Sequence, residues 1–400
     1  MPRTPATLPE GVRITDHISL GVIAKTFPRE TVDEVLEETG RSSERERSLP
    51  AHVMVYYVIA MALYMQVAYR EVLRCLVEGL RWLLGPEMEL SVAGKSGISQ
   101  ARSRLGPEPL KLLYERIVGP IAVKRTQGAW YRHWRTVSLD GTTVAVADTA
   151  ENEEAFGRPG QSRGKAAQPL VRLMSLVGSG THVLFGARMA DYHTGEKTLA
   201  EQILPGLRRG MLCIADRNFY SFKLWEKARA NGAELLWRMK KNMRLPCDRR
   251  LPDGSYLSRL YSSEKARRND TNPVQVRVVE YTLEGAENAE PIYRLITTIL
   301  DPKKAPADEL AALYHERWEI ETAFDEFKTH LRGGAEVVLR SKRPDLFIQE
   351  LYGLLLAHFA IRGLMHEVAL EHKRDPDELS FTHAVRVIRR TLPTFSAFSP

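Results

Sequence analysis

The sequence predicts an α/β protein with an all-α domain in front of its sheet and further helices behind it. Apolar residues recur with helical spacing from Pro28 to about Val123. After His133 the pattern changes to short apolar runs of strand length that alternate with helical stretches. Such alternation is typical of an α/β sheet and excludes a pure helical bundle.

The N-terminal helices are expected to break at residues 40–50, 85–97 and 106–107, where glycine and proline occur. Within them, Val53 to Tyr69 is apolar or aromatic apart from Gln66. This stretch is shorter than the roughly 20 residues that a membrane span needs, and it contains four tyrosines. We therefore expect a buried helix and no membrane partner.

Short buried strands and intervening helices make up the middle of the chain. Strands are expected at Thr136 to Asp140, Thr143 to Ala147, Leu170 to Val177, His182 to Ala187, Leu212 to Asp216 and Glu234 to Met239, and helices at Glu196 to Leu204 and Ser221 to Asn231. From about 240 to 300 the pattern indicates a β-rich insertion, with alternating runs at Val274 to Leu283 and Ile292 to Leu300. Helices return at 307–334, 345–368 and 381–391.

Composition narrows the class of protein. The chain has 400 residues, 44% apolar and 27% charged, which excludes disordered and collagen-like chains. Its net charge of +7 suits a polyanionic partner without establishing one. Three widely spaced cysteines, Cys75, Cys213 and Cys247, cannot build a disulfide framework or a cysteine zinc site. We therefore expect a reduced, cytoplasmic protein, since the N-terminus also lacks the apolar segment of a signal peptide.

Two aspartates come at the ends of predicted buried strands. Asp140 follows Val-Ser-Leu, and Asp216 follows Cys-Ile-Ala. A carboxylate in such a place must be solvated, paired or bound to metal, because an isolated buried charge is strongly unfavourable. A single strand-end aspartate more often opens a turn or caps a helix. Two of them in one sheet favour a metal site.

A third group of polar side chains shares one stripe of the helix near residue 320. At about 100° per residue, Tyr314, Arg317, Glu321 and Lys328 project within a narrow sector. An apolar stripe lies beside it, formed by Leu313, Ile320, Phe324, Phe327 and Leu331. The alternative is an ordinary solvated helix face in which Arg317 and Glu321 form a salt bridge one turn apart.

Two other motifs can be excluded. Gly94-Lys95-Ser96 lacks the first glycine of a phosphate-binding loop, because residue 89 is Glu89. His366 and His372 are six residues apart, which puts them on different sides of a helix and excludes a zinc-protease pair.

The spacing of the helix stripe resembles a known signature. Tyr314, Arg317, Glu321 and Lys328 match the Tyr-Arg-Glu-Lys signature of DDE transposases in the insertion sequence four group. The segments 139–142 and 215–220 resemble that group's two aspartate motifs, and residues 235–240 resemble the strand that follows the second. Residues 27–106 are similar to its helical N-terminal domain.

The resemblance implies a ribonuclease H-like catalytic core with a β-rich insertion. It divides the chain into a helical N-terminal DNA-binding domain at 1–130, a catalytic domain at 131–343 and a C-terminal helical region at 344–400. Asp140, Asp216 and Glu321 would be the catalytic residues and would hold two Mg²⁺ or Mn²⁺ ions per active site. Asp325 lies only about 40° from Glu321 on the wheel. Glu321 is favoured because it occupies the signature position.

The implied function is cutting insertion-sequence ends and joining them to target DNA. Tyr314, Arg317 and Lys328 would bind DNA phosphates. Three side chains of the helix at Ser96 to Gly106, namely Gln100, Arg102 and Arg104, are further DNA-binding candidates, unless that helix is simply solvated. Trp237 and Tyr293 are candidates for stacking a flipped base, although core packing is the commoner role of such aromatics.

The implied partners are double-stranded DNA, both terminal inverted repeats and target, and a second copy of the chain on that DNA. A bacterial, nucleoid-associated location follows from the same resemblance. Two alternatives remain open: a metal-dependent nuclease without strand transfer, and a catalytically inactive DNA-binding relative. The second is disfavoured by the three carboxylates, which an inactive protein has no need to keep.

Overall fold

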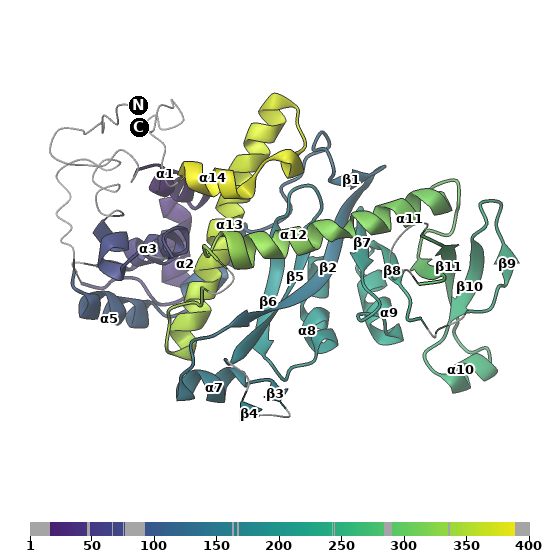
Figure 1. The fold of residues 1–400 in the computed structure, drawn as a ribbon, viewed down its shortest axis with the longest axis horizontal. Coiled ribbons are helices and arrows are strands. Elements are labelled where there is room, and N and C mark those ends of the chain that lie inside the picture. Colours follow the sequence, from purple (N-terminus) through teal and green to yellow (C-terminus); the bar gives the residue numbers. More distant parts are fainter. Residues whose placement is uncertain are drawn as a thin grey trace. The chain divides into compact units, whose positions relative to one another are not determined.

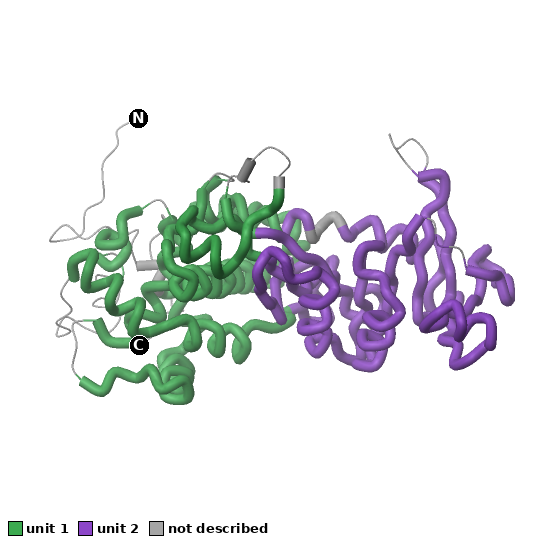
Figure 2. The backbone as a smooth tube through the Cα atoms, turned by 90° about the horizontal axis from the view of Figure 1, so that it is seen from below, with its two compact units in different colours: residues 1–121, 144–171, 324–400 green, residues 122–143, 172–323 purple. Residues whose placement is uncertain are grey.

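The computed structural model describes residues 17–45, 49–65, 67–74, 76, 93–161, 164–165, 168–241, 243, 245–283, 290–334 and 337–388. The chain forms two compact units, each built from separate segments (Figure 2). Unit 1 comprises residues 1–121, 144–171 and 324–400, and unit 2 comprises residues 122–143 and 172–323. The three-domain division expected from the sequence stays a prediction.

Unit 2 is built on a 10-stranded sheet with the order β6-β5-β2-β7-β8-β12-β11-β10-β9, and β1 pairs with β2 (Figure 1). The strands are β1 (Trp130–Tyr131), β2 (Trp134–Ala145), β5 (Leu170–Gly178), β6 (Leu184–Asp191), β7 (Met211–Ala215), β8 (Glu234–Arg238), β9 (Arg249–Arg250), β10 (Tyr256–Leu260), β11 (Val274–Tyr281) and β12 (Tyr293–Thr297). β2, β7 and β8 run parallel, whereas β12, β11, β10 and β9 continue the sheet antiparallel. The described strands of the β-rich segment therefore extend the central sheet.

Helices cover both faces of this sheet. α11 (Ala307–His315) packs Leu310 and Leu313 onto a buried cluster with Ile214 and Leu236 of the central strands. α8 (Glu196–Ile203) and α9 (Phe222–Ala230) contact the strands β6 and β8 respectively. Because neighbouring residues of a strand face opposite sides, Leu236 meets α11 whereas Trp237 meets α9.

Unit 1 is helical. Its helices are α1 (His17–Thr26), α2 (Arg29–Glu38), α3 (Ala51–Leu63), α5 (Lys95–Leu105), α6 (Glu108–Ile117), α7 (Ala150–Phe156), α13 (Pro344–His372) and α14 (Phe381–Ile388), with a small hairpin of β3 (Gly160–Gln161) and β4 (Gly164–Lys165). α3 packs along α13, where Gly353 lets the two backbones approach. A Cβ atom at Gly353 would lie 2.7 Å from the carbonyl oxygen of Val58.

Two apolar helices have the composition of membrane segments, but both are core helices of unit 1. Every residue of α3 from Val53 to Leu63 is buried, which confirms the predicted buried helix. In the described part of the chain, α13 is long and apolar enough to cross a membrane, yet 72% of its apolar window is buried. Its contacts with α1, α3 and α6 account for that apolar surface.

The helix that carries the four-residue signature is irregular. It runs from α11 through a 3₁₀ turn (η3, Glu316–Trp318) and α12 (Glu319–Asp325) into a π turn (η4, Glu326–His330). The boundary between the units falls within this run, after Ala323. The uniform 100° wheel expected from the sequence is therefore wrong here, since 3₁₀ and π turns have different numbers of residues per turn.

Other expectations need smaller corrections. The two strands predicted at 136–140 and 143–147 are one strand, β2, because Gly141 does not turn the chain but packs against β5. A Cβ atom at Gly141 would lie 2.7 Å from Cε of Met174. Helix α1 was not predicted, nor were β9, β10 and the short helix α10 (Glu264–Arg268). The helix expected at 381–391 is described as far as Ile388.

Candidate active site

Asp140 and Asp216 lie side by side at the sheet. β2 and β7 are parallel, and Leu139 pairs with Ala215, so the next residues along the two strands are the two aspartates. Paired residues of parallel strands project to the same face, and Ile214 of β7 faces α11. The two aspartates, called here the carboxylate pair, therefore project to the face that α11 covers. The strand register thus brings the two aspartates to neighbouring positions, and their catalytic role stays a prediction.

The Asp140 carboxylate is poorly compensated. Its side chain is 24% exposed, and Nη1 of Arg317 lies 3.7 Å from Oδ2. The backbone N–H of Gly141 donates to Oδ1 at 2.8 Å. Burial raises the pKa of Asp140 to about 6, against the opposing effects of Gly141 and Arg317 and with a contribution from the charge of Asp216. Asp140 thus lacks a close cation that would hold its charge.

Tyr314 lies beneath this site and does not line it. Its side chain is 5% exposed, and its hydroxyl has no hydrogen-bond partner among the described residues. Burial raises the pKa of Tyr314 to about 12, although Arg317 opposes the shift. The Arg317 guanidinium carbon lies 5.9 Å from the ring centroid. A direct hydroxyl contact with phosphate is therefore not available in this structure, where the Tyr314 ring instead lies next to the Arg317 guanidinium.

Glu321 is not part of a preformed ligand cluster. It lies in α12, one turn after Arg317, and its side chain is exposed. In the part of the chain that the structure describes, no three His, Cys, Asp or Glu side chains are grouped to hold a metal ion. Asp325 instead pairs with Nε2 of His330 at 3.1 Å. The role of Glu321 as third ligand stays a prediction.

Lys328 belongs to unit 1 and lies within the π turn η4. Its backbone carbonyl accepts a hydrogen bond from Nε of Arg332. The side chain is half-buried, and its predicted contact with phosphate stays a prediction.

Arg102 is wrongly predicted as a DNA contact. It is 3% exposed, donates from Nε to Oε1 of Gln349 at 2.9 Å and from Nη2 to Oγ of Ser341 at 2.9 Å. Both partners lie far away in the sequence, so the spacing on α5 could not reveal them. Gln100 and Arg104 of the same helix are exposed and remain candidates.

Of the two aromatic residues predicted to stack on a flipped base, Trp237 is wrongly predicted. It is fully buried, with its ring 5.3 Å from Trp225 in an edge arrangement, so it cannot stack on a base. Tyr293 is partly exposed. It stacks on Tyr281 with a centroid distance of 5.3 Å, and the guanidinium carbon of Arg238 lies 4.7 Å from its ring. Its role in stacking stays a prediction.

The sequence analysis missed an ionic network at this edge of the sheet. Glu290 accepts from Nη1 of Arg217 at 2.7 Å and lies 3.1 Å from Nη2 of Arg238. Arg217 directly follows Asp216, and Arg238 ends the neighbouring strand β8, so strand-end position could have found both. Glu290 comes from the connection between β11 and β12, which no sequence pattern placed here.

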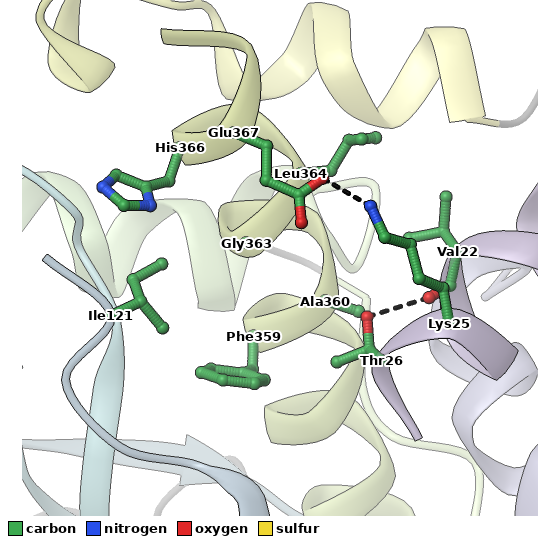
Figure 3. Close-up of a pocket in the computed structure, with 10 residues that line it drawn as sticks. All are labelled: Val22, Lys25, Thr26, Ile121, Phe359, Ala360, Gly363, Leu364, His366 and Glu367. Atoms are coloured by element: carbon green, nitrogen blue, oxygen red, sulfur yellow. Dashed lines mark hydrogen bonds and ion pairs between the residues drawn. The ribbon is translucent and has the colours of Figure 1, made fainter. Parts of the chain in front are cut away.

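A cavity of about 230 Å³ lies elsewhere, in unit 1, between α1 and α13 (Figure 3). Its lining is mostly apolar, and its charged residues Lys25 and Glu367 pair with each other at 2.6 Å. None of the predicted site residues lines it. The carboxylate pair therefore remains the candidate active site.

The site has the donor chemistry of a divalent metal centre. Mg²⁺ and Mn²⁺ prefer carboxylate oxygens, and two carboxylates side by side repel each other unless a cation lies between them. Burial is the main cause of the raised pKa of Asp140, and the neighbouring charge of Asp216 adds to it. The residues present therefore fit a hard divalent ion.

Comparison with known proteins identifies the family of the chain. Residues 17–115 match the family model described as insertion element 4 transposase N-terminal, and residues 135–360 match the transposase DDE domain. The second match alone covers more than half of the chain. The chain therefore belongs to the DDE transposases, a family that generally uses divalent metal ions.

Within that family, the chain is a DNA transposase of the insertion sequence four group. It is 28% identical over 389 residues to transposase InsG for insertion sequence element IS4 of Escherichia coli K12, which covers 93% of this chain and 82% of that relative. The putative transposase InsZ of the same organism is 24% identical over 220 residues, 55% of this chain and 71% of its own length. The piggyBac transposase synaptic complex with hairpin DNA aligns over 96% of this chain and 84% of its own, at a TM-score of 0.45 and 12% identity.

Proposed function

We propose that this transposase cuts the ends of an insertion sequence and joins them to target DNA at a ribonuclease H-like active site. The observation that carries the proposal is the carboxylate pair, placed by parallel strands beneath the helix with the transposase signature. Arg317 of that signature lies 3.7 Å from Asp140, so the sheet and the helix meet at this point.

Asp140, Asp216 and Glu321 would hold two Mg²⁺ or Mn²⁺ ions. When bound, such ions activate the attacking oxygen and stabilise the leaving oxygen of an in-line displacement at phosphorus. The Gly141 N–H fixes one oxygen of Asp140 at 2.8 Å, which orients the carboxylate before any ion arrives. This preorganisation supports Asp140 as a ligand.

Arg317 would bind the DNA phosphate next to the cleaved bond. Its guanidinium offers five N–H donors in a fixed plane, and among the described residues it has a long contact with Asp140 and lies against the ring of Tyr314. The remaining donors are suited to phosphate oxygens. Lys328 would add a point charge that binds DNA phosphate, and Tyr314 would keep Arg317 in place by packing beneath it.

The remaining parts of the chain would bind and pair the DNA ends. We assign end binding to residues 1–130, with Gln100 and Arg104 exposed on α5, catalysis to residues 131–343 and assembly to residues 344–400. Tyr293 would stack a flipped base. Because two terminal inverted repeats must be held together, we expect a homodimer on double-stranded DNA in the bacterial cytoplasm, associated with the nucleoid.

The decisive experiment incubates purified protein and Mg²⁺ with labelled DNA that carries candidate ends, then resolves nicked, hairpin and joined products. Joined products with the wild-type protein, absent with Asp216→Asn, are the expected result. Nicked products without joining would favour the metal-dependent nuclease. Binding without either product would favour the inactive DNA-binding relative.

A further inference from the structure

The signature helix changes its winding where it reaches Lys328. In η4 the backbone N–H of Leu331 donates to the carbonyl of Glu326 at 2.8 Å, five residues back, which is the bond of a π turn. A π turn takes more residues per turn than an α-helix, so it changes the direction in which its side chains project. The direction of Lys328 therefore depends on whether this turn forms.

The first residue of the π turn is locked to another helix of the same unit. Glu326 is 5% exposed and accepts from Nε of Arg362 at 2.8 Å. Nη2 of Arg362 donates to its second oxygen, and Nε2 of His358 lies 3.5 Å away. Both partners are 1% exposed residues of α13. The carboxylate is thus held by a two-point contact that fixes its position and orientation.

Aromatic rings enclose this ion pair. The Arg362 guanidinium carbon lies 5.6 Å from the ring centroid of Phe381 in α14, and the His358 ring lies 5.3 Å from the same ring. Phe327, the second residue of the π turn, meets the edge of His358 at 6.1 Å. The first two residues of the turn, Glu326 and Phe327, therefore both contact side chains of α13.

Stability alone does not account for a charge pair at such a place. Replacing a buried ion pair by apolar side chains of similar volume is often neutral or stabilising, because both charges lose their hydration on burial. An apolar pair would fill the space but would not define one orientation of the helix. The specific contribution of Glu326 and Arg362 is therefore geometric.

We propose that Glu326 is a positioning residue, which holds the π turn through Arg362 and thereby sets the direction of Lys328 for its contact with DNA. This inference rests on the proposed function, in which Lys328 contacts DNA. Glu326 itself touches neither DNA nor metal.

The test combines Lys328→Ala with an apolar pair, Glu326→Met plus Arg362→Met, and measures how end-DNA binding depends on salt without divalent ions. The slope of log affinity against log salt should fall by about 0.9 for each lost contact with duplex DNA. Lys328→Ala should lower it by that amount in the wild-type background. The apolar pair should lower it equally, and Lys328→Ala should then have no further effect.

A matched control is Lys25→Met plus Glu367→Met, which removes an exposed ion pair between α1 and α13 and also leaves the net charge unchanged. In this control Lys328→Ala should keep its full effect. Thermal unfolding establishes that each variant is folded; Glu326→Gln alone would leave Arg362 buried without its partner and serves less well.

Three outcomes separate the two proposals. If Lys328→Ala still lowers the slope in the apolar-pair background, the positioning role is overturned. If Arg317→Ala lowers the slope but Lys328→Ala does not in the wild-type background, the DNA function stands and the positioning role is overturned. If neither substitution matters and no ends are cut, the proposed function itself fails.

Discussion

Two carboxylates of this transposase, one buried and one half-buried, have opposite surroundings. Glu326, in unit 1, has a two-point contact with Arg362 and a histidine at 3.5 Å. Asp140, in unit 2, has one backbone N–H and an arginine at 3.7 Å, and it adjoins Asp216, which carries the same charge. Both are acids inside a folded protein, but only the first has a partner that neutralises it.

The difference separates a charge used for structure from one kept available for function. A buried charge with close partners is part of the fold, and removing it leaves the partner uncompensated. A buried charge without a close partner destabilises the fold. Such a charge is typical of functional sites, where a bound ligand provides the opposite charge. The comparison therefore predicts opposite effects of neutralising the two carboxylates.

The largest effect is expected on catalysis. Asp140→Asn, Asp216→Asn and Glu321→Gln should each lower cleavage of end DNA by roughly 100-fold or more, because each removes a ligand from ions that supply several kcal/mol of transition-state stabilisation. Asp325→Asn is the matched control and should keep most activity, since Asp325 pairs with His330. If Asp325→Asn abolishes cleavage and Glu321→Gln does not, the register of the active-site helix is wrong.

The second-largest effect is expected on the stability of unit 1. Glu326→Gln should lower the free energy of unfolding by about 3 kcal/mol, because Arg362 then remains buried without its counter-charge. Urea denaturation followed by circular dichroism measures the change. A loss below about 1 kcal/mol would mean that this carboxylate is no better compensated than Asp140.

Asp140→Asn should change the free energy of unfolding in the opposite direction. In chelator at pH 7.5 it should raise the free energy of unfolding by about 1 kcal/mol, because the folded protein no longer carries a poorly compensated charge. The folded-state pKa of about 6 exceeds the ordinary value of 3.8, so this destabilisation is absent below about pH 4, grows as pH rises and is complete above about pH 6. The gain from the substitution should follow that pH profile.

Added Mg²⁺ should make the wild-type protein more stable than Asp140→Asn, the reverse of the order expected in chelator. It should raise the melting temperature of the wild-type protein and leave Asp140→Asn largely unchanged, since binding to the folded state alone stabilises it. Equal shifts in both proteins would show that the ion binds away from the carboxylate pair.

The smallest effect on stability is expected for Arg104→Ala on helix α5. Arg104 is exposed, so its removal should change the free energy of unfolding by less than about 0.5 kcal/mol. It should nevertheless lower the salt slope of end binding by about 0.9. Arg102→Ala, on the same helix, should destabilise the protein because Arg102 bonds to Gln349 and Ser341. A salt slope unchanged by Arg104→Ala would remove α5 from the DNA-binding surface.

The carboxylate pair could be predicted from sequence because its determinants are local. Each aspartate follows a short apolar run, and parallel strands bring the ends of such runs together. The signature spacing likewise identified Arg317, which the structure places beside Asp140.

Features that depend on distant partners could not be predicted in this way. The π turn at Lys328 is coupled to Arg362 on another helix, and the burial of Arg102 depends on side chains more than 200 residues away. Glu290 contacts Arg217 and Arg238, which lie 73 and 52 residues earlier in the sequence. Helical spacing and propensity contain no information about such contacts.

The packing of α3 against α13 also sets an order of events during synthesis. α3 ends at Leu63 and α13 begins at Pro344, so about 280 residues must be added before the partner exists. At roughly 5–20 residues per second this takes on the order of 15–60 seconds. During that interval α3 can pack only against the early helices α1, α2 and α5, and its face toward α13 has no partner. A chain that stops before Pro344 never covers that face. Truncated products are therefore expected to aggregate or be degraded, which leaves full-length chains as the soluble population.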